Sequence, residues 1–120
     1  MKTPITLRYR LWFEQAGEHV MGSGMLHLLR CVHELGSLKK AAESMGMPYR
    51  GAWGRVRKAE GVLGVALVES SRRRQRGVTL TPAALELLEV FTLLDAQCND
   101  FLRERLRELP LTAFAMDSGH

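Results

Sequence analysis

The side chains that could do chemistry are mainly arginines and lysines gathered in the middle of the chain. Ten of the 17 basic residues lie between residues 37 and 76, where only three acidic residues occur. This segment carries a net charge of +7 and the rest of the chain −3. Such a division is an electrostatic footprint for a polyanion, although a solvated surface without a partner has the same composition. The ten residues are Lys39, Lys40, Arg50, Arg55, Arg57, Lys58, Arg72, Arg73, Arg74 and Arg76.

Histidine, cysteine and serine residues form no catalytic or metal-binding pattern. His27, Cys31 and His33 are close together, but on a helix residues 27 and 31 share a face while residue 33 turns away. The sequence contains no nucleophile motif and no glycine-rich phosphate-binding loop. It therefore predicts a protein that is not an enzyme and needs no metal or cofactor.

The composition excludes several other classes of protein. No apolar run approaches the ~18 residues of a membrane span, and the N-terminus lacks the layout of a signal peptide. Cys31 and Cys98 are too few for a disulfide scaffold, and both fall at apolar positions of helical patterns. We expect a cytoplasmic protein with reduced cysteines and no membrane partner.

Three short helices are predicted to position the basic residues. Apolar side chains recur at helical spacing over residues 23–35, with Ser23 as a cap and Gly36 as the stop. A second helix starts at Ser37 and ends near Gly46, and a third runs over residues 48–63. Two short helices joined by a glycine-containing turn, the second basic on its exposed side, indicate a helix-turn-helix.

Extended segments are predicted on both sides of the helices. Residues 66–70 and 77–80 read as two strands joined by a basic loop, the arrangement called a wing when it stands beside a helix-turn-helix. Residues 5–13 begin with alternating apolar and polar residues, which predicts an N-terminal strand.

A long final helix is predicted over residues 82–109, opened by Thr81 and Pro82. It has two apolar faces, which suggests that one face packs on its own domain and the other on a second copy of the chain. The alternative is a single wide core stripe in a monomer. Residues 1–109 then form one domain and residues 110–120 a tail. The predicted dimer residues are Leu87, Phe91, Leu94, Cys98 and Phe101.

The stretch GSLKKAAESMGMPYRGAWGRVRKAEGVLGVALVESSRRRQRGVTLTPAA resembles the DNA-binding domain of LysR-type transcription regulators. The shared features are the Gly-Ser, the paired alanines, the Leu-Gly at residues 63–64 and the closing Leu-Thr-Pro. Met47, Tyr49, Ala52 and Trp53, with the strand-like ITLRYRLWFE, are more similar to ModE-type, molybdate-responsive regulators. The resemblance covers residues 4 to about 108.

This resemblance implies a mostly α fold with a small β component, a winged helix-turn-helix that dimerises through its long C-terminal helix and binds double-stranded operator DNA. By position, the recognition helix is residues 48–62 and the wing is residues 72–76. The implied DNA-facing residues are Ser37, Lys39, Lys40, Tyr49, Arg50, Trp53, Arg57, Arg72, Arg73, Arg74 and Arg76.

The chemistry of these side chains suggests separate roles. Arginine can pair bidentately with a guanine edge, so Arg50 is our candidate for base recognition, while Arg57 and Lys58 are placed to meet phosphates. Trp53 fits either an indole N–H contact at the DNA or a partly buried core aromatic. Tyr49 fits either a phosphate contact or a cover for the helix start. The wing arginines suit backbone or minor-groove contacts.

Two features depart from the ModE-type pattern. The oxyanion-binding modules that follow the long helix in that group have no counterpart in this sequence, so no molybdate pocket is expected in this chain. Pro48 stands where a serine-type cap is usual, so we expect the recognition helix to start without a side-chain cap. A helix-turn-helix subunit that works with a separate effector-sensing protein is the alternative function.

Overall fold

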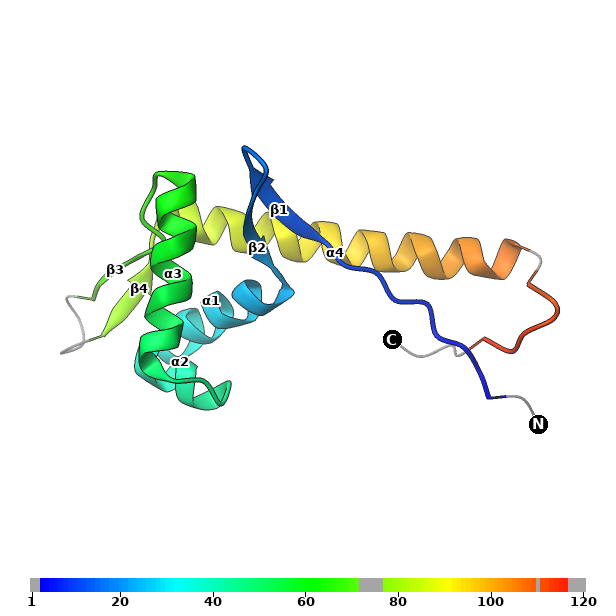
Figure 1. The fold of residues 1–120 in the computed structure, drawn as a ribbon, viewed down its shortest axis with the longest axis horizontal. Helices are drawn as coiled ribbons and strands as arrows, with labels where there is room; N and C mark the ends of the chain where they lie inside the picture. Colours follow the sequence, from blue (N-terminus) through cyan, green and yellow to red (C-terminus); the bar gives the residue numbers. More distant parts are fainter. Residues whose placement is uncertain (1–2, 72–76, 110, 117–120) are drawn as a thin grey trace.

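The computed structural model describes residues 3–71, 77–109 and 111–116. A cluster of three helices and a small hairpin stands at one end of a long helix that projects well beyond it (Figure 1). This is the predicted winged helix-turn-helix, mostly helical with two small antiparallel sheets. The elements in chain order are β1 (Trp12–Gln15), β2 (Glu18–Gly22), α1 (Ser23–Leu35), α2 (Leu38–Ser44), α3 (Tyr49–Leu63), β3 (Val68–Ser70), β4 (Val78–Leu80) and α4 (Pro82–Glu108).

The ends of the three short helices follow the predicted signals, with one exception at the start of α1. Ser23, predicted as the cap, is instead the first residue of the helix, which begins after Gly22 without a side-chain cap. The backbone N–H of Lys40 donates to Ser37 Oγ at 3.1 Å, which caps α2. Gly46 adopts a left-handed φ of 66°, which lets the chain turn sharply between α2 and α3. Pro48 precedes α3 without a side-chain cap, as expected.

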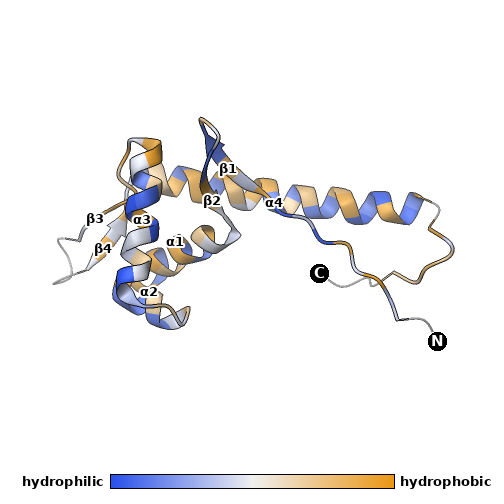
Figure 2. Ribbon diagram, viewed as in Figure 1, coloured by the Kyte–Doolittle hydropathy of each residue, from blue (hydrophilic) through white to orange (hydrophobic). Residues whose placement is uncertain are grey.

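Small side chains let the helices of the core approach closely. Ala41 and Ala42 of α2 and Ala52 of α3 are almost completely buried. They pack with the apolar face of α1, which explains how a seven-residue helix stays in place. Figure 2 shows the alternation of apolar and polar residues along the helices. The largest fully buried side chains are Met21, Leu28, Leu29, Val32, Val56, Leu67 and Phe91.

The second hairpin confirms the two predicted extended segments. β3 and β4 pair antiparallel, with Val68 opposite Leu80 and Ser70 opposite Val78. Val68 and Leu80 are buried in the core, which fixes the hairpin against the helices. The loop arginines Arg72, Arg73, Arg74 and Arg76 lie outside the described residues.

The predicted N-terminal strand is wrong for residues 5–11. The first strand, β1, begins only at Trp12 and pairs with β2 through a turn at Ala16 and Gly17, both at positive φ. Residues 5–11 are largely irregular, apart from an isolated bridge between Ile5 and Met116. The Tyr9 hydroxyl instead lies 2.9 Å from both the carbonyl oxygen and Oδ1 of Asp95 in α4.

One predicted dimer residue on α4 belongs to the core of its own domain. Phe91 is 1% exposed, and its ring meets that of Phe13 edge-on at 5.7 Å between centroids. Its assignment to a subunit interface is therefore wrong, because the hairpin and α1 already cover that face of the helix. Leu87 is half-buried against the same core.

The other predicted dimer residues are more accessible. Leu94 is 39% and Phe101 62% exposed, and Cys98 is half-buried. Val90 is exposed on the same side of α4, so the helix carries an apolar strip away from the core. Within the described ranges, no helix is long and apolar enough to cross a membrane.

Candidate nucleic-acid interface

The exposed face of α3 is basic and narrow. Ala52, Val56 and Ala59 are buried on one side of the helix, so Arg50 and Lys58 project from the opposite side. Gly54 lies on this outer face with no atom close to where a Cβ would stand. The sequence prediction of exposed basic residues here is confirmed, and the glycine leaves the helix backbone open to a close-fitting partner.

Tyr49, Trp53 and Arg57 form a stack along one flank of α3. The rings of Tyr49 and Trp53 meet edge-on at 6.3 Å, with 83° between their planes. The guanidinium carbon of Arg57 lies 4.4 Å from the centroid of the Trp53 ring, at cation–π distance. Trp53 is half-buried against the core, while Tyr49 is exposed. The indole thus supports Arg57 from beneath.

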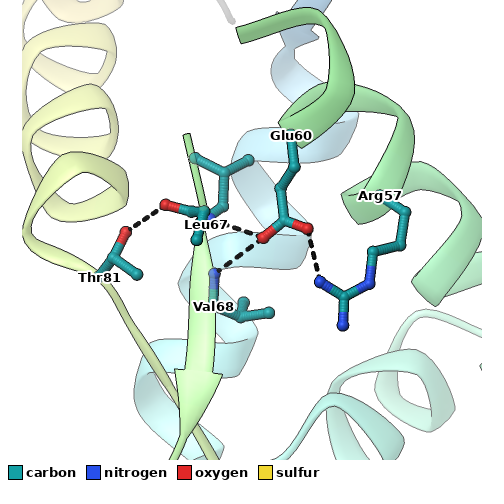
Figure 3. Close-up of polar contacts among 6 residues, drawn as sticks. Arg57, Glu60, Leu67, Val68 and Thr81 are labelled. Atoms are coloured by element: carbon teal, nitrogen blue, oxygen red, sulfur yellow. Dashed lines mark hydrogen bonds and ion pairs between the residues drawn. The ribbon is translucent and has the colours of Figure 1, made fainter. Parts of the chain in front are cut away.

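Glu60 connects this flank to the wing (Figure 3). Its Oε1 accepts from Arg57 Nη1 at 2.7 Å, and its Oε2 accepts from the backbone N–H of Leu67 at 2.7 Å and of Val68 at 3.4 Å. On the other side of the same strand, the Thr81 hydroxyl donates to the carbonyl of Ala66 at 2.7 Å. One carboxylate therefore holds both an arginine of α3 and the start of β3.

The ionisation of Glu60 is favoured by these partners. Burial raises the pKa of its carboxyl, but the hydrogen bonds from Leu67 N–H, the Arg57 side chain and Val68 N–H outweigh this, so the pKa of Glu60 is lowered. Because the folded-state pKa is depressed, the stabilisation is present above the unfolded-state pKa and is lost as the pH falls through the folded-state value.

We expect Glu60→Ala to lower the free energy of unfolding by about 1–3 kcal/mol, the range for removing the acceptor of charged hydrogen bonds. The difference from the wild type should shrink as the pH falls through the lowered pKa of Glu60, because the wild-type carboxylate then becomes protonated as well. Urea unfolding of both proteins across pH 3–7 measures this. A pH-independent difference would contradict the role assigned to the charge of Glu60.

The start of α2 presents a second basic group. Lys39 and Lys40 are exposed in its first turn, two and three residues after the capping residue Ser37. α2 packs against α3, so the lysines and the basic face of α3 belong to one rigid unit. This is the arrangement in which a supporting helix contacts a nucleic-acid backbone while the next helix reads bases.

Residues 24–85, just over half of the chain, match the family described as bacterial regulatory helix-turn-helix protein, lysR family. The chain belongs to the LysR family. The matched residues run from α1 through the helix-turn-helix and the wing to the start of α4.

A curated relative is similar to most of this chain. The molybdenum transport protein ModE of Herbaspirillum seropedicae is 33% identical over 100 residues, covering 79% of this chain and 37% of that protein. The LysR-family chain thus spans just over a third of the length of this curated relative.

Solved structures with the same fold include DNA complexes. A CbnR DNA-binding domain–DNA complex has a TM-score of 0.57 and 27% identity, covering 74% of this chain and 100% of that chain. ArgP from Mycobacterium tuberculosis has a TM-score of 0.52 and 27% identity, covering 68% of this chain and 29% of that one.

The structure also shows residues of this LysR-family chain that sequence reasoning missed. The sequence analysis assigns Glu60 no role, although an acidic residue three positions after Arg57 is a recognisable helical pairing signal. Arg55, whose guanidinium stands beside Gly24 of α1, was counted only in the basic total. The contact of Glu60 with Leu67 and the contact of Arg55 with Gly24 each join two different elements, so local spacing could not predict them.

His27 and Cys31, which the sequence places on one face of a helix, lie near each other on α1. Cys31 Sγ lies 3.9 Å from His27 Nε2 on the same face of α1, and the Ser44 hydroxyl is 3.6 Å from the sulfur. In the part of the chain that the structure describes, no group of three His, Cys, Asp or Glu residues could hold a metal ion.

Proposed function

We propose that this chain is the DNA-binding domain of a bacterial transcription regulator and binds double-stranded operator DNA. The observation that carries the proposal is the exposed basic face of α3, braced by α2 and tied to the wing through Glu60. Its family membership and its likeness to a DNA-binding domain solved on DNA support this function. Because it acts on the genome, we propose a cytoplasmic location.

The residue roles follow from position and chemistry. Arg50 is exposed near the N-terminal end of α3, the part of a recognition helix that meets base edges, so it reads a guanine. Lys58 lies two turns further along α3 and contacts a phosphate. Arg57 also contacts a phosphate, once it has left its ion pair with Glu60. Backbone or groove contacts are proposed for Ser37, Lys39, Lys40, Tyr49, Trp53, Arg72, Arg73, Arg74 and Arg76.

A homodimer formed through α4 presents two recognition helices to the two halves of an operator. The apolar strip that includes Leu94, Cys98 and Phe101 is the proposed contact, extended by Val90. In a two-fold dimer the same strip meets itself, so a single apolar stripe is sufficient. Half-sites of the operator are then expected as an inverted repeat.

We expect Arg50→Ala to weaken operator binding about 5- to 150-fold, the equivalent of ~1–3 kcal/mol for one bidentate base contact. Affinity for random duplex should change far less. Fluorescence anisotropy at one fixed salt concentration measures both, using an operator selected from random DNA. Arg107→Ala, at the far end of α4, is the control that removes the same charge.

Equal losses on operator and random DNA would assign Arg50 to phosphate contact. No loss on either would remove it from the interface.

A further inference from the structure

A basic cavity lies on the other flank of α3 and shares Lys58 with the exposed basic face of that helix. It has a volume of about 300 Å³ and is bounded by the β1–β2 hairpin region, the first turn of α1 and the middle of α3. Its position is distinct from the stack of Trp53 and Arg57, which faces the wing. The lining includes Arg10, His19, Ser23, Gly24, Arg55 and Lys58.

The charge of this cavity is uncompensated. Arg10, Arg55 and Lys58 line it together, and its lining contains no carboxylate. The ion pairs of Arg57 with Glu60 and of Arg105 with Glu108 involve no residue of the lining, so neither neutralises it. The guanidinium carbon of Arg10 lies 6.0 Å from the centroid of the Trp12 ring. Three converging cations repel one another unless an anion lies between them.

The floor of the cavity adds further positive potential. α1 begins after Gly22 with no side-chain cap and no acidic residue in its first turn, so backbone N–H groups remain available there. Arg55 Nη1 lies only 3.6 Å from the position that a Cβ on Gly24 would occupy. The guanidinium therefore stands directly over the first turn, and both present donors to the same space.

We propose that this cavity binds a phosphate-type oxyanion. A tetrahedral oxyanion offers several acceptor oxygens, which suits a site with guanidinium, ammonium and backbone donors arriving from three directions. The proposal stands on the cavity and the convergence of its cations, with the helix terminus as an additional donor. The oxyanion is either a backbone phosphate of bound DNA or a free phosphate ion.

The free-ion arm of the test measures the thermal midpoint of the full chain in sodium phosphate and in sodium chloride of equal ionic strength. We expect a saturable rise of a few degrees with phosphate alone. Arg55→Gln should abolish the rise, while Arg107→Gln, which removes an equal charge at the far end of α4, should retain it. This arm does not require DNA binding, so it stands apart from the proposed function.

The DNA arm measures the dependence of the DNA affinity on salt. If the cavity holds a backbone phosphate, Arg55→Gln should reduce the slope of log K against log salt by about one, with Arg107→Gln unchanged. Unaltered phosphate response and unaltered salt slope in Arg55→Gln would overturn the proposal.

Gly24→Asp provides a second variant that does not remove a basic group. A carboxylate in the first turn of α1 beside Arg55 would act as a built-in anion. We expect this variant to melt higher than the wild type in chloride and to lose the response to phosphate. A lower midpoint with an intact phosphate response would contradict the site.

Discussion

Replacing Phe91 with alanine is expected to lower the free energy of unfolding by about 3–5 kcal/mol, the range for truncating a buried aromatic side chain. Phe91 is 1% exposed and its ring packs edge-on against Phe13. Truncation would leave a cavity where α4, α1 and the first hairpin meet. Since small domains are stable by only ~5–15 kcal/mol, this is a large share of the total.

Denaturant unfolding measured by circular dichroism tests this expectation. Phe114→Ala is the matched control, because it removes the same ring from an exposed position outside the core. We expect Phe114→Ala to change the free energy of unfolding by less than about 0.5 kcal/mol. Similar values for the two variants would contradict the placement of Phe91 in the core.

Replacing Leu94 with glutamate is expected to dissociate the proposed dimer. Leu94 is exposed in one copy, between Val90 and Phe101 on the same side of α4. In the dimer the glutamate would be buried without a partner, at a cost of about 3–5 kcal/mol, which weakens association roughly 10²- to 10⁴-fold. The fold of the single domain should persist, because its core does not include Leu94.

Sedimentation across a range of protein concentrations measures this effect. Ala96→Glu is the control, because residue 96 is exposed and lies about 160° around the helix from residue 94. We expect the wild type and Ala96→Glu to form dimers at concentrations where Leu94→Glu sediments as a monomer. Equal masses for all three proteins would remove this strip from the interface.

The helices and their ends could be predicted because their signals are local. Ser37 caps α2 by accepting a hydrogen bond from the backbone N–H of Lys40, three residues later. In α3, the spacing of apolar residues predicts that Ala52 is buried and Arg50 exposed. The extent of the N-terminal strand could not be predicted, because alternating apolar and polar residues indicate an extended segment but do not show which segment it pairs with. The Tyr9 hydroxyl donates a hydrogen bond to Asp95 of α4, which lies 86 residues away in the sequence.

The candidate interface was predictable to a similar extent. Exposure of Arg50, Arg57 and Lys58 follows from the period of α3. The carboxylate of Glu60 reaches Leu67 after the chain has turned back, and Phe91 is covered by Phe13 from the first hairpin. Both arrangements depend on how the elements pack against one another. The sequence therefore predicts two apolar faces on α4 but does not show which residues the core buries.

Selection of bound duplexes from a random DNA pool by the purified chain, followed by sequencing, tests the central claim most directly. DNA recognition through paired recognition helices predicts enrichment of one motif, with two inverted half-sites centred about one helical turn, or a multiple of it, apart. Enrichment should collapse when the selection is repeated with Arg50→Ala. A pool that retains random sequence through successive rounds, with the wild-type chain folded, would contradict sequence-specific DNA binding.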